Sequence, residues 1–577
     1  MICCYLLLAV ALTWRLWAGP ASRVPTDGGG VTDDIFLSAW FMRYAAIAVA
    51  HGRLPALAST ALNAPQGVNV MWNTSLLLPA VLLAPLTLLA GPDASLTVML
   101  TLGFAGSAAT MFLVLRRWGA GLAAAAAGGA LFGFSPALRQ AAMYHYHLQF
   151  ALLVPLIIDA VLLLVTGRGR PVRTGAWLGL LTVAQLLTAE ELLADVAIAL
   201  IVILTVLGIS RRALIRPAIR PLLTGAATAL AVLAVLGGYA IWTQFHGPLA
   251  ASGIPWNTGL YGNQPADFVT APNAMVLHGH GFLLFTAATG QRLSEYLGYL
   301  GWPLLALVLA ATIGCWRDLR VRAAGVTFIV LELLSIGGRA APVGGLSLSP
   351  LLLPWHWLER LPVLSQMLPN RLSIIGDAAA AAVLAFSVAR VRALTLAPRR
   401  RWVAVAAAAA GLAAVLPVLP LPLDATVAGG PPAGWTVVIA SLRLRPGAAV
   451  LQLPVTPVGA MAWQAATGAD VSLVGGYCIA PIGGGGRTGE CTAPAALTGD
   501  QNAAVAATNL LASGLPASGG PPRATVRSAL AAWHPAAVIT ACGRASPLGQ
   551  YLLRVLGPPT AQDGMVLGWR MPHREMG

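Results

Sequence analysis

The sequence predicts an α-helical polytopic membrane protein with a C-terminal extracytoplasmic domain of α/β or α+β type. Of its 577 residues, 57% are hydrophobic and only 10% are charged, whereas soluble domains carry roughly 25% charged residues. The same figures exclude a disordered chain, which is rich in charge and poor in apolar residues. The basic residues are all arginine and gather in clusters between apolar stretches. The net charge of +15 is therefore read as a topology signal, and no nucleic-acid partner is expected.

The arginine clusters orient the apolar stretches, because cytoplasmic loops of membrane proteins collect arginine and lysine. The clusters lie at residues 116–117, 168–173, 211–220, 317–322 and 390–401. Between successive clusters the apolar segments form pairs, as helices that cross outward and return must do. The expected helices cover residues 119–134 and 150–166, 174–188 and 191–208, 222–245 and 296–315, 323–337 and 375–390, and finally 402–422, which leads the chain outward.

The same alternation of outward and inward crossings predicts the topology of the N-terminal part. Residues 1–18 are predicted to form a retained first helix with a cytoplasmic N-terminus, since neither a basic start nor a small-residue cleavage site marks a signal peptide. Residues 94–115 must then run inward. The segment 76–90 has no crossing to make and contains two prolines, so we expect a broken helix at the outer interface. The transmembrane domain is thus 1–423, with about eleven transmembrane helices and 19–93 as the first outer loop.

Residues 424–577 form a different kind of segment, rich in Gly, Pro, Ala and Thr, and are predicted to be a soluble extracytoplasmic domain. Short strand-like runs are GWTVVIASL, AAVLQLP, VSLVGGY and AAVITACG, and RATVRSALAAW is expected to be an amphipathic helix. Cys478 and Cys491 fall in this domain, where a disulfide is chemically permitted. Cys542 is a competing partner. No spacing typical of a structural zinc site occurs.

Acidic residues are the first candidates for function, because the chain has only 20 and each one near the membrane needs an explanation. Asp33 and Asp34 directly precede the stretch IFLSAWFMRYAAIAV. One interpretation is a pair of helix-capping residues, which satisfy free backbone N–H groups. The other is a catalytic base, since two adjacent acids exceed what a cap requires.

The segment 136–149 is expected to be a loop at the outer mouth of two helices, and it contains His145, His147 and Gln149. These residues are read either as part of an interfacial aromatic belt with solvated histidines or as donors to a phosphate or sugar. Histidines at positions i and i+2 do not share a helix face, so a metal site formed by the two is disfavoured.

Further polar candidates lie on the same expected side of the membrane. Glu190 and Glu191 occupy the tip of a helical hairpin, either as a solvated corner or as ligand-binding acids. Tyr261 belongs to the turn-rich loop 246–295, whose composition suits a segment that covers substrate. Arg371 begins a helix from the outside, so an anion at the outer surface lies within its reach; Arg339 is a second candidate.

These residues concentrate on the outer face, and no comparable set faces the cytoplasm. A site there, beside lipid, suits a reaction between a lipid-phosphate-linked substrate and an external acceptor. The chain resembles the GT-C superfamily of integral-membrane glycosyltransferases, especially its actinobacterial members. The resemblance rests on the loose motifs TDDIFLSAWFMRY (32–44), ALNAPQGVNVMWNTSLLLPAVLLAPLTLLAG (61–91), HYHLQFALLVPL (145–156), TAEELL (188–193) and LPVLSQMLPNRLSI (361–374).

The resemblance implies an inverting transfer of a sugar from a polyprenyl-phosphate carrier to a cell-envelope glycan, lipid or protein. Asp33 or Asp34 would be the general base. Arg371, with His145 or His147, would stabilise the phosphate leaving group. Glu190 or Glu191 would bind acceptor hydroxyls or, as in metal-using relatives, a divalent ion, so no metal is assigned. The protein would reside in the plasma membrane.

Two other classes compete with this interpretation. A transporter or flippase for lipid-linked saccharides needs ionisable residues along a path through the bilayer, and only Asp159, Glu332 and Asp377 are further acids within the expected spans. A non-catalytic scaffold that binds cell-wall polymer through its tail would leave Asp33 and Asp34 unexplained.

Overall fold

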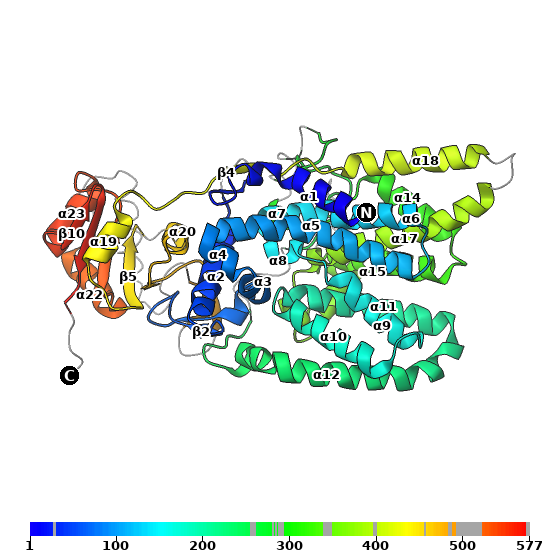
Figure 1. Ribbon diagram of the computed structural model, residues 1–577, viewed down its shortest axis with the longest axis horizontal. Coiled ribbons are helices and arrows are strands. Elements are labelled where there is room, and N and C mark those ends of the chain that lie inside the picture. The colour runs from blue at the N-terminus through cyan, green and yellow to red at the C-terminus, as the bar shows by residue number, and fades with distance from the viewer. Residues whose placement is uncertain are drawn as a thin grey trace. The chain divides into compact units, whose positions relative to one another are not determined.

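The computed structural model describes residues 1–26, 31–253, 261–279, 282, 286, 293–338, 349–395, 401–454, 457–482, 487–491 and 522–572. The chain divides into two compact units (elements labelled in Figure 1). The first, which we call the helical unit, comprises Met1–Gly30, Thr97–Gly238 and Trp256–Thr426. The second, the mixed unit, comprises Val31–Leu96, Tyr239–Pro255 and Val427–Gly577.

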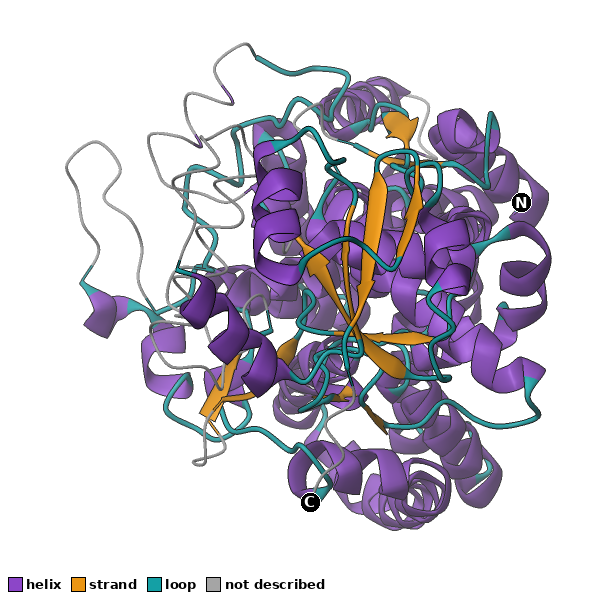
Figure 2. Ribbon diagram, turned by 90° about the vertical axis from the view of Figure 1, so that its left-hand side faces the viewer, coloured by secondary structure: helices purple, strands orange, loops and turns teal. Residues whose placement is uncertain are grey.

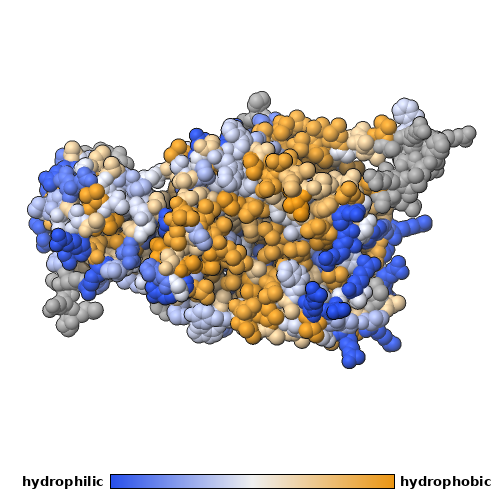
Figure 3. Space-filling view, in the orientation of Figure 1, coloured by the Kyte–Doolittle hydropathy of each residue, from blue (hydrophilic) through white to orange (hydrophobic). Residues whose placement is uncertain are grey.

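Helices dominate the helical unit because its segments are rich in alanine and leucine, the strongest helix formers, and because a helix satisfies its own backbone hydrogen bonds in lipid. Apolar residues cover much of the surface formed by these helices (Figure 3). The helices are α1 (Ile2–Trp17), α5 (Pro92–Arg117), α6 (Leu122–Gly133), α7 (Pro136–Tyr144), α8 (Tyr146–Gln149), α9 (Val154–Val165), α10 (Pro171–Leu186), α11 (Glu190–Ser210), α12 (Ile215–His246), α14 (Trp302–Gly314), α15 (Leu319–Ser335), α16 (Pro354–Leu358), α17 (Leu372–Thr395) and α18 (Arg401–Val415).

A helix is present at each of the eleven expected positions. Among the described residues, four helical stretches are long and apolar enough to cross a membrane by themselves: Pro92–Arg117, Glu190–Ser210, Ile215–His246 and Pro369–Val388. A multi-pass membrane protein is therefore indicated, while the count of eleven crossings stays a prediction. Short 3₁₀ turns complete the unit, of which η4 (Leu293–Glu295) and η7 (Pro369–Arg371) matter below.

The mixed unit begins with α2 (Asp33–Ala50), followed by α3 (Leu77–Leu82) and α4 (Ala84–Ala90). The last two confirm the predicted break within residues 76–90: Leu76 adopts a left-handed conformation before α3, and Pro85 opens α4. Proline is tolerated in the first turn of a helix but not in its interior. The strands β2 (Ala58–Ser59) and β3 (Val68–Asn69) form a short antiparallel pair in this part of the chain.

A five-stranded sheet lies in the C-terminal part of the mixed unit, with strand order β10-β11-β9-β5-β6 (Figure 2). β5 pairs in parallel with both β6 and β9, whereas β11 runs antiparallel to β9 and β10. The strands are β5 (Ala448–Leu453), β6 (Val471–Leu473), β9 (Ala537–Thr540), β10 (Ala561–Asp563) and β11 (Val566–Arg570). The helices of this part are α19 (Trp435–Ser441), α20 (Pro457–Thr467), α22 (Arg523–Trp533) and α23 (Pro547–Leu556). The expected α/β character is therefore observed.

Alternate residues of each strand point to opposite faces of this sheet, as a pleated strand requires. Leu451 and Val538 pack with α22 and α23 on one face, whereas Val450 and Ile539 pack with α19 on the other. The run GWTVVIASL, which was expected to be a strand, is the helix α19. Its buried residues Trp435, Val438 and Leu442 follow helical spacing, so packing against the sheet overrides the preference of Val and Ile for strands.

Cys478 and Cys491 form a disulfide beside the hairpin of β7 (Ile479–Ile482) and β8 (Arg487–Glu490). The other cysteines, Cys3, Cys4, Cys315 and Cys542, are free thiols. Of the pairings that the sequence left open, the structure thus selects Cys478 with Cys491.

This pairing predicts a thiol count. Denatured but unreduced protein should react with four equivalents of maleimide, and with six after reduction, because only the disulfide sulfurs are protected. The Cys542→Ser variant should lower both counts by one. A count of six before reduction would contradict the disulfide and, with it, an oxidising environment for this part of the chain.

Candidate functional site

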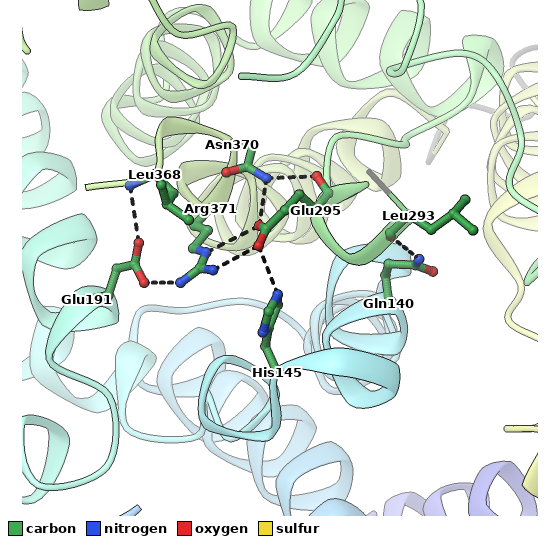
Figure 4. A network of polar contacts seen from close by, with 8 residues as sticks. All are labelled: Gln140, His145, Glu191, Leu293, Glu295, Leu368, Asn370 and Arg371. Carbon is green, nitrogen blue, oxygen red and sulfur yellow. Dashed lines mark hydrogen bonds and ion pairs between the residues drawn. The ribbon is translucent and has the colours of Figure 1, made fainter. Parts of the chain in front are cut away.

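A buried ion-pair network lies around Arg371 in the helical unit (Figure 4). One terminal nitrogen of its guanidinium contacts Glu191 Oε2, and the other lies 3.0 Å from Glu295 Oε1. The side chain of Arg371 is only 10% exposed. The network joins three segments that are far apart in the sequence, namely the start of α11, the turn η4 and the turn η7.

Glu295 is the centre of this network because three side chains donate to it. His145 Nε2 lies 2.9 Å from its Oε1, Asn370 Nδ2 lies 3.1 Å from its Oε2, and Arg371 contacts both oxygens. Asn370 also donates to the Glu295 carbonyl at 2.7 Å. Gln140 holds the same turn by donating to the Leu293 carbonyl at 2.7 Å. The turn η4 is thereby fixed by side chains from both α7 and η7.

The sequence of η7 explains why Arg371 is placed so firmly. Pro369 opens the turn, where its missing N–H costs nothing, and the backbone N–H of Leu368 donates to Glu191 Oε1 at 3.2 Å. Glu191 therefore receives one bond from the turn and one from the guanidinium that follows it. Such charge-assisted bonds from guanidinium to carboxylate are among the strongest in proteins.

Groups of opposite charge meet in the network. Burial by itself raises the pKa of Glu295, but the charges of Arg371 and His145 outweigh burial and hold that pKa well below its ordinary range. Glu295 is thus ionised, and the guanidinium of Arg371 contacts both this carboxylate and that of Glu191. The carboxylates of Glu191 and Glu295 compensate the buried charge of Arg371. Its guanidinium therefore attracts an added anion less strongly than an isolated arginine does.

His147 lies beside the network, with its ring centroid 5.7 Å from that of His145. Burial, followed by the neighbouring His145 and Arg371, lowers the pKa of His147 well below its ordinary value. The imidazole is therefore neutral at pH 7. Its Nε2 is buried and has no hydrogen-bond partner among the described residues.

The segment 136–149, expected to be a loop, is helical and buried instead. Ser135 caps α7 by accepting a bond from the Leu138 N–H, and Pro136 occupies the first helical position, which together favour a helix start. His145 and His147 are consequently not solvated: they are 6% and 8% exposed.

Gln149 and Tyr261 are buried by packing within the helical unit. Gln149 Nε2 donates to the Leu100 carbonyl at 3.1 Å, and Gly103 leaves room for this side chain, since a Cβ there would lie 2.2 Å from Gln149 Oε1. The Tyr261 carbonyl accepts a bond from the Asn370 N–H at 3.2 Å. Glu190 is half-buried at the first position of α11, next to Glu191.

Asp33 and Asp34 occupy the first turn of α2, in the mixed unit. Asp33 is exposed and Asp34 is half-buried. Both carboxylates lie at the positive end of the helix dipole, where an anion is stabilised. The structure thus brings His145, Glu191 and Arg371 into one network with His147 beside it, and it places the paired aspartates at a helix start in the other unit. Arg339 lies outside the described residues.

Sequence patterns alone assign no role to two residues of the helical unit, Glu295 and Arg139. Glu295 was visible only as one acid in a long loop, and its pairing with Arg371 spans 76 residues. Arg139, in α7, is 5% exposed, and burial lowers the pKa of its guanidinium to about 10. Its one hydrogen bond among the described residues runs from Nε to the Leu421 carbonyl at 3.5 Å, so no described carboxylate neutralises it.

The described residues contain no group of three His, Cys, Asp or Glu side chains arranged to hold a metal ion. Glu191 and Glu295 direct their oxygens to Arg371, and a guanidinium in that position would repel a cation. The acids of the network therefore do not fit a divalent metal, and no chemistry is assigned to one.

Asp267, in the loop that precedes α14, predicts a pH dependence of stability. Burial raises its pKa to about 7, although the Gln264 N–H donates to it at 2.7 Å. The unfolded chain releases this proton near pH 4, so stability should fall as the pH rises from about 4 to 7, by up to about 4 kcal/mol. Asp267→Asn cannot ionise and should remove this loss.

The measurement is thermal unfolding of the detergent-solubilised protein at pH 5 and pH 8. The advantage of Asp267→Asn over the unaltered chain should grow between these two values. An equal difference at both would show that Asp267 is ionised in the folded protein.

No family profile and no curated protein sequence matches this chain. Among solved structures, it is similar to the arabinofuranosyltransferase AftD from Mycobacteria, with a TM-score of 0.50 and 15% identity, over 96% of this chain and 36% of that one. It is also similar to the Archaeoglobus fulgidus oligosaccharyltransferase tethered with an acceptor peptide (TM-score 0.48, 12% identity, 93% of this chain and 68% of that one). A third structure is AglB from the same organism, in complex with an inhibitory peptide and a dolichol-phosphate (TM-score 0.45, 12% identity, 94% and 69%).

This chain spans little more than a third of the length of AftD. At 15% identity the likeness shows a common fold, which is the fold that the sequence motifs predicted. The GT-C resemblance is therefore confirmed at the level of architecture.

Proposed function

We propose that this chain, which has the fold of the GT-C membrane glycosyltransferases, transfers a sugar from a polyprenyl-phosphate donor to a cell-envelope glycan, lipid or protein. The observation that carries the proposal is the match to that fold over 96% of the chain. A fold by itself does not fix a reaction, so the proposal also needs residues suited to each chemical role. The helical unit and the start of α2 offer such residues.

In this proposal, Asp33 or Asp34 removes the proton from an acceptor hydroxyl. The freed oxygen attacks the anomeric carbon of the donor sugar, the bond from that carbon to the phosphate oxygen breaks, and the configuration inverts. The proton ends on the aspartate and the electron pair on the lipid phosphate. Asp33 suits this role because its carboxylate is exposed at the start of a helix.

The leaving phosphate requires positive charge and hydrogen-bond donors. Arg371 contributes the N–H groups that Glu191 and Glu295 do not use, in a position that those two acids fix. His147 is neutral and offers a buried nitrogen without a described partner. Arg139 adds a buried cation that no described carboxylate neutralises. Preorganised donors of this kind are the largest contribution to stabilising charge that develops in a reaction. Glu190, Gln149 and Tyr261 complete the proposed surroundings of the substrates.

The proposed orientation places the N-terminus in the cytoplasm and the region from residue 424 outside the plasma membrane. The reaction then takes place at the outer face, where cell-envelope acceptors are found.

The test uses the purified full chain in lipid nanodiscs with radiolabelled polyprenyl-phosphate sugars and an envelope extract as acceptor. Label in the acceptor fraction, dependent on the protein, supports the proposal. In a parallel assay with the chain in sealed vesicles, label that crosses the bilayer without reaching the acceptor would identify a flippase instead. Binding of polymer without transfer would identify a scaffold.

A further inference from the structure

A cavity of about 380 Å³ lies within the mixed unit, and part of its wall belongs to α2, the helix that begins with the paired aspartates. Its walls come from the second half of α2, the segment that follows α2, the end of α20 and the start of β6. The side chains that matter most are Trp40, Arg43, Tyr44, Arg53, Gln464 and Asp470. A volume of this size is near the lower end for pockets that hold small molecules.

Hydrogen bonds hold the inner wall of the cavity in place. Trp40 Nε1 donates to Gln464 Oε1 at 2.7 Å, and Arg43 Nε donates to the Ala465 carbonyl at 2.7 Å. These two bonds join α2 to α20. The ring of Tyr44 stacks on that of Trp40, with centroids 5.0 Å apart and an angle of 11° between the planes. Its hydroxyl donates to the Ala56 carbonyl at 2.9 Å. The aromatic part of the cavity is therefore preorganised.

The outer part of the cavity is polar and carries both signs of charge. Arg53 and Asp470 are both exposed, and neither side chain forms a hydrogen bond or ion pair with the described residues. Arg43 is half-buried, donates through Nε to the Ala465 carbonyl and interacts electrostatically with Asp93. The cavity thus combines an aromatic wall with donors from arginine and an acceptor from aspartate.

This combination excludes the simpler ligand classes. A hydrocarbon chain would cover the charges of Arg53 and Asp470 without giving either a partner, and burying an unpaired charge is unfavourable. A compact anion such as free phosphate would meet Asp470, and a cation would meet Arg43 and Arg53. A ligand that suits all of these groups has an apolar face for the aromatic rings and an edge of hydroxyl groups that both donate and accept.

We propose that the cavity between α2, α20 and β6 binds a saccharide, with the ring face of one sugar on Tyr44 and its hydroxyls on Arg43, Arg53 and Asp470. The site shares helix α2 with Asp33 and Asp34, but saccharide binding there does not require the transfer reaction. It holds a glycan without reacting with it, through residues that none of the proposed chemical steps uses.

The test measures binding without any donor lipid. The full chain in nanodiscs is mixed with a panel of defined tetrasaccharides, made of α- or β-linked glucose, mannose, galactose, arabinose or galacturonate. Saturation-transfer NMR detects contact with sugar ring protons, and quenching of tryptophan fluorescence gives the affinity. We expect at least one oligosaccharide to bind, with transfer to its ring protons.

Variants locate the binding. Tyr44→Ala should weaken binding about tenfold, since an aromatic contact contributes about 1 kcal/mol or more, and Asp470→Asn should weaken it less. Tyr239→Ala removes an exposed aromatic residue of the same unit, 68% exposed and outside the cavity, and should leave binding unchanged. The unfolding midpoint of each variant shows whether the fold is intact.

Three results would overturn the proposal: no tetrasaccharide binds, binding is equal in Tyr44→Ala, or inorganic phosphate binds and Asp470→Asn strengthens it, which would identify an anion site. A chain that binds saccharide without transferring sugar would refute only the proposed function. A chain that transfers sugar without binding saccharide here would refute only this site.

Discussion

Replacing Arg371 with methionine should lower the free energy of unfolding by about 3–5 kcal/mol, which is the cost of removing one partner from a buried ion pair. The change leaves the carboxylates of Glu191 and Glu295 without their shared cation, and both side chains are largely buried, at 18% and 6% exposure. Thermal unfolding in detergent, or titration with a denaturing detergent, measures the loss.

Second-site changes separate this effect from the loss of a large side chain. Arg371→Met combined with Glu295→Gln should recover part of the stability, because the second change removes one of the uncompensated charges. The stability of Arg371→Lys should lie between that of Arg371→Met and that of the double variant, since an ammonium cannot bridge two carboxylates as a planar guanidinium does. If Arg371→Met, its combination with Glu295→Gln and Arg371→Lys all unfold at the same midpoint, the ion pairs contribute nothing to stability.

The pair of Arg15 and Asp424 provides the matched control. These side chains form an ion pair in the same unit, but they are 40% and 59% exposed. Surface pairs contribute about 0–1 kcal/mol, so Arg15→Gln should change stability little. A loss as large as that of Arg371→Met would contradict the assignment of the effect to burial.

Replacing the aspartate that we propose as the general base should reduce sugar transfer by about 10²–10⁴-fold, the usual contribution of such a base. Asp33→Asn and Asp34→Asn are made separately, because the sequence does not distinguish them, and one variant should lose far more turnover than the other. Affinity for the donor should change little, since in the proposed mechanism the base contacts the acceptor hydroxyl.

Asp563→Asn is the control, as a half-buried aspartate at the edge strand β10 of the five-stranded sheet. It should retain full transfer. If both Asp33→Asn and Asp34→Asn also retain full transfer, the assignment of the base is wrong, even where the chain proves to be a glycosyltransferase.

The helices were predictable because lipid imposes a strong constraint on the sequence. A backbone in hydrocarbon must bond to itself, so apolar length and arginine position together locate each helix, and all eleven expected positions are helical. The broken helix at 76–90 was predictable because proline interrupts a helix. In the C-terminal part, short strand-like runs identified β5, β6 and β9, whereas the β-branched residues of α19 suggested a strand where the chain forms a helix.

The site was only partly predictable. Arg371 and Glu191 stand out as charges where the sequence offers few, but their mutual contact does not follow from spacing, because 180 residues separate them. Glu295 has no local motif and owes its place to Arg371, Asn370 and His145. The burial of His145 and His147 depends on α7. Ser135 and Pro136 predict where this helix begins, but its burial results from packing against helices elsewhere in the chain.

The network around Arg371 has a consequence for how the protein is made. Synthesis delivers Glu191 first, Glu295 next and Arg371 last, so the two acids enter the assembling bundle long before Arg371, which bridges them. The three segments cannot settle until the start of α17 has been inserted. A chain truncated before residue 369 should therefore be recognised as incomplete and degraded. Arg371 completes the ion-pair network of the bundle late in its biogenesis.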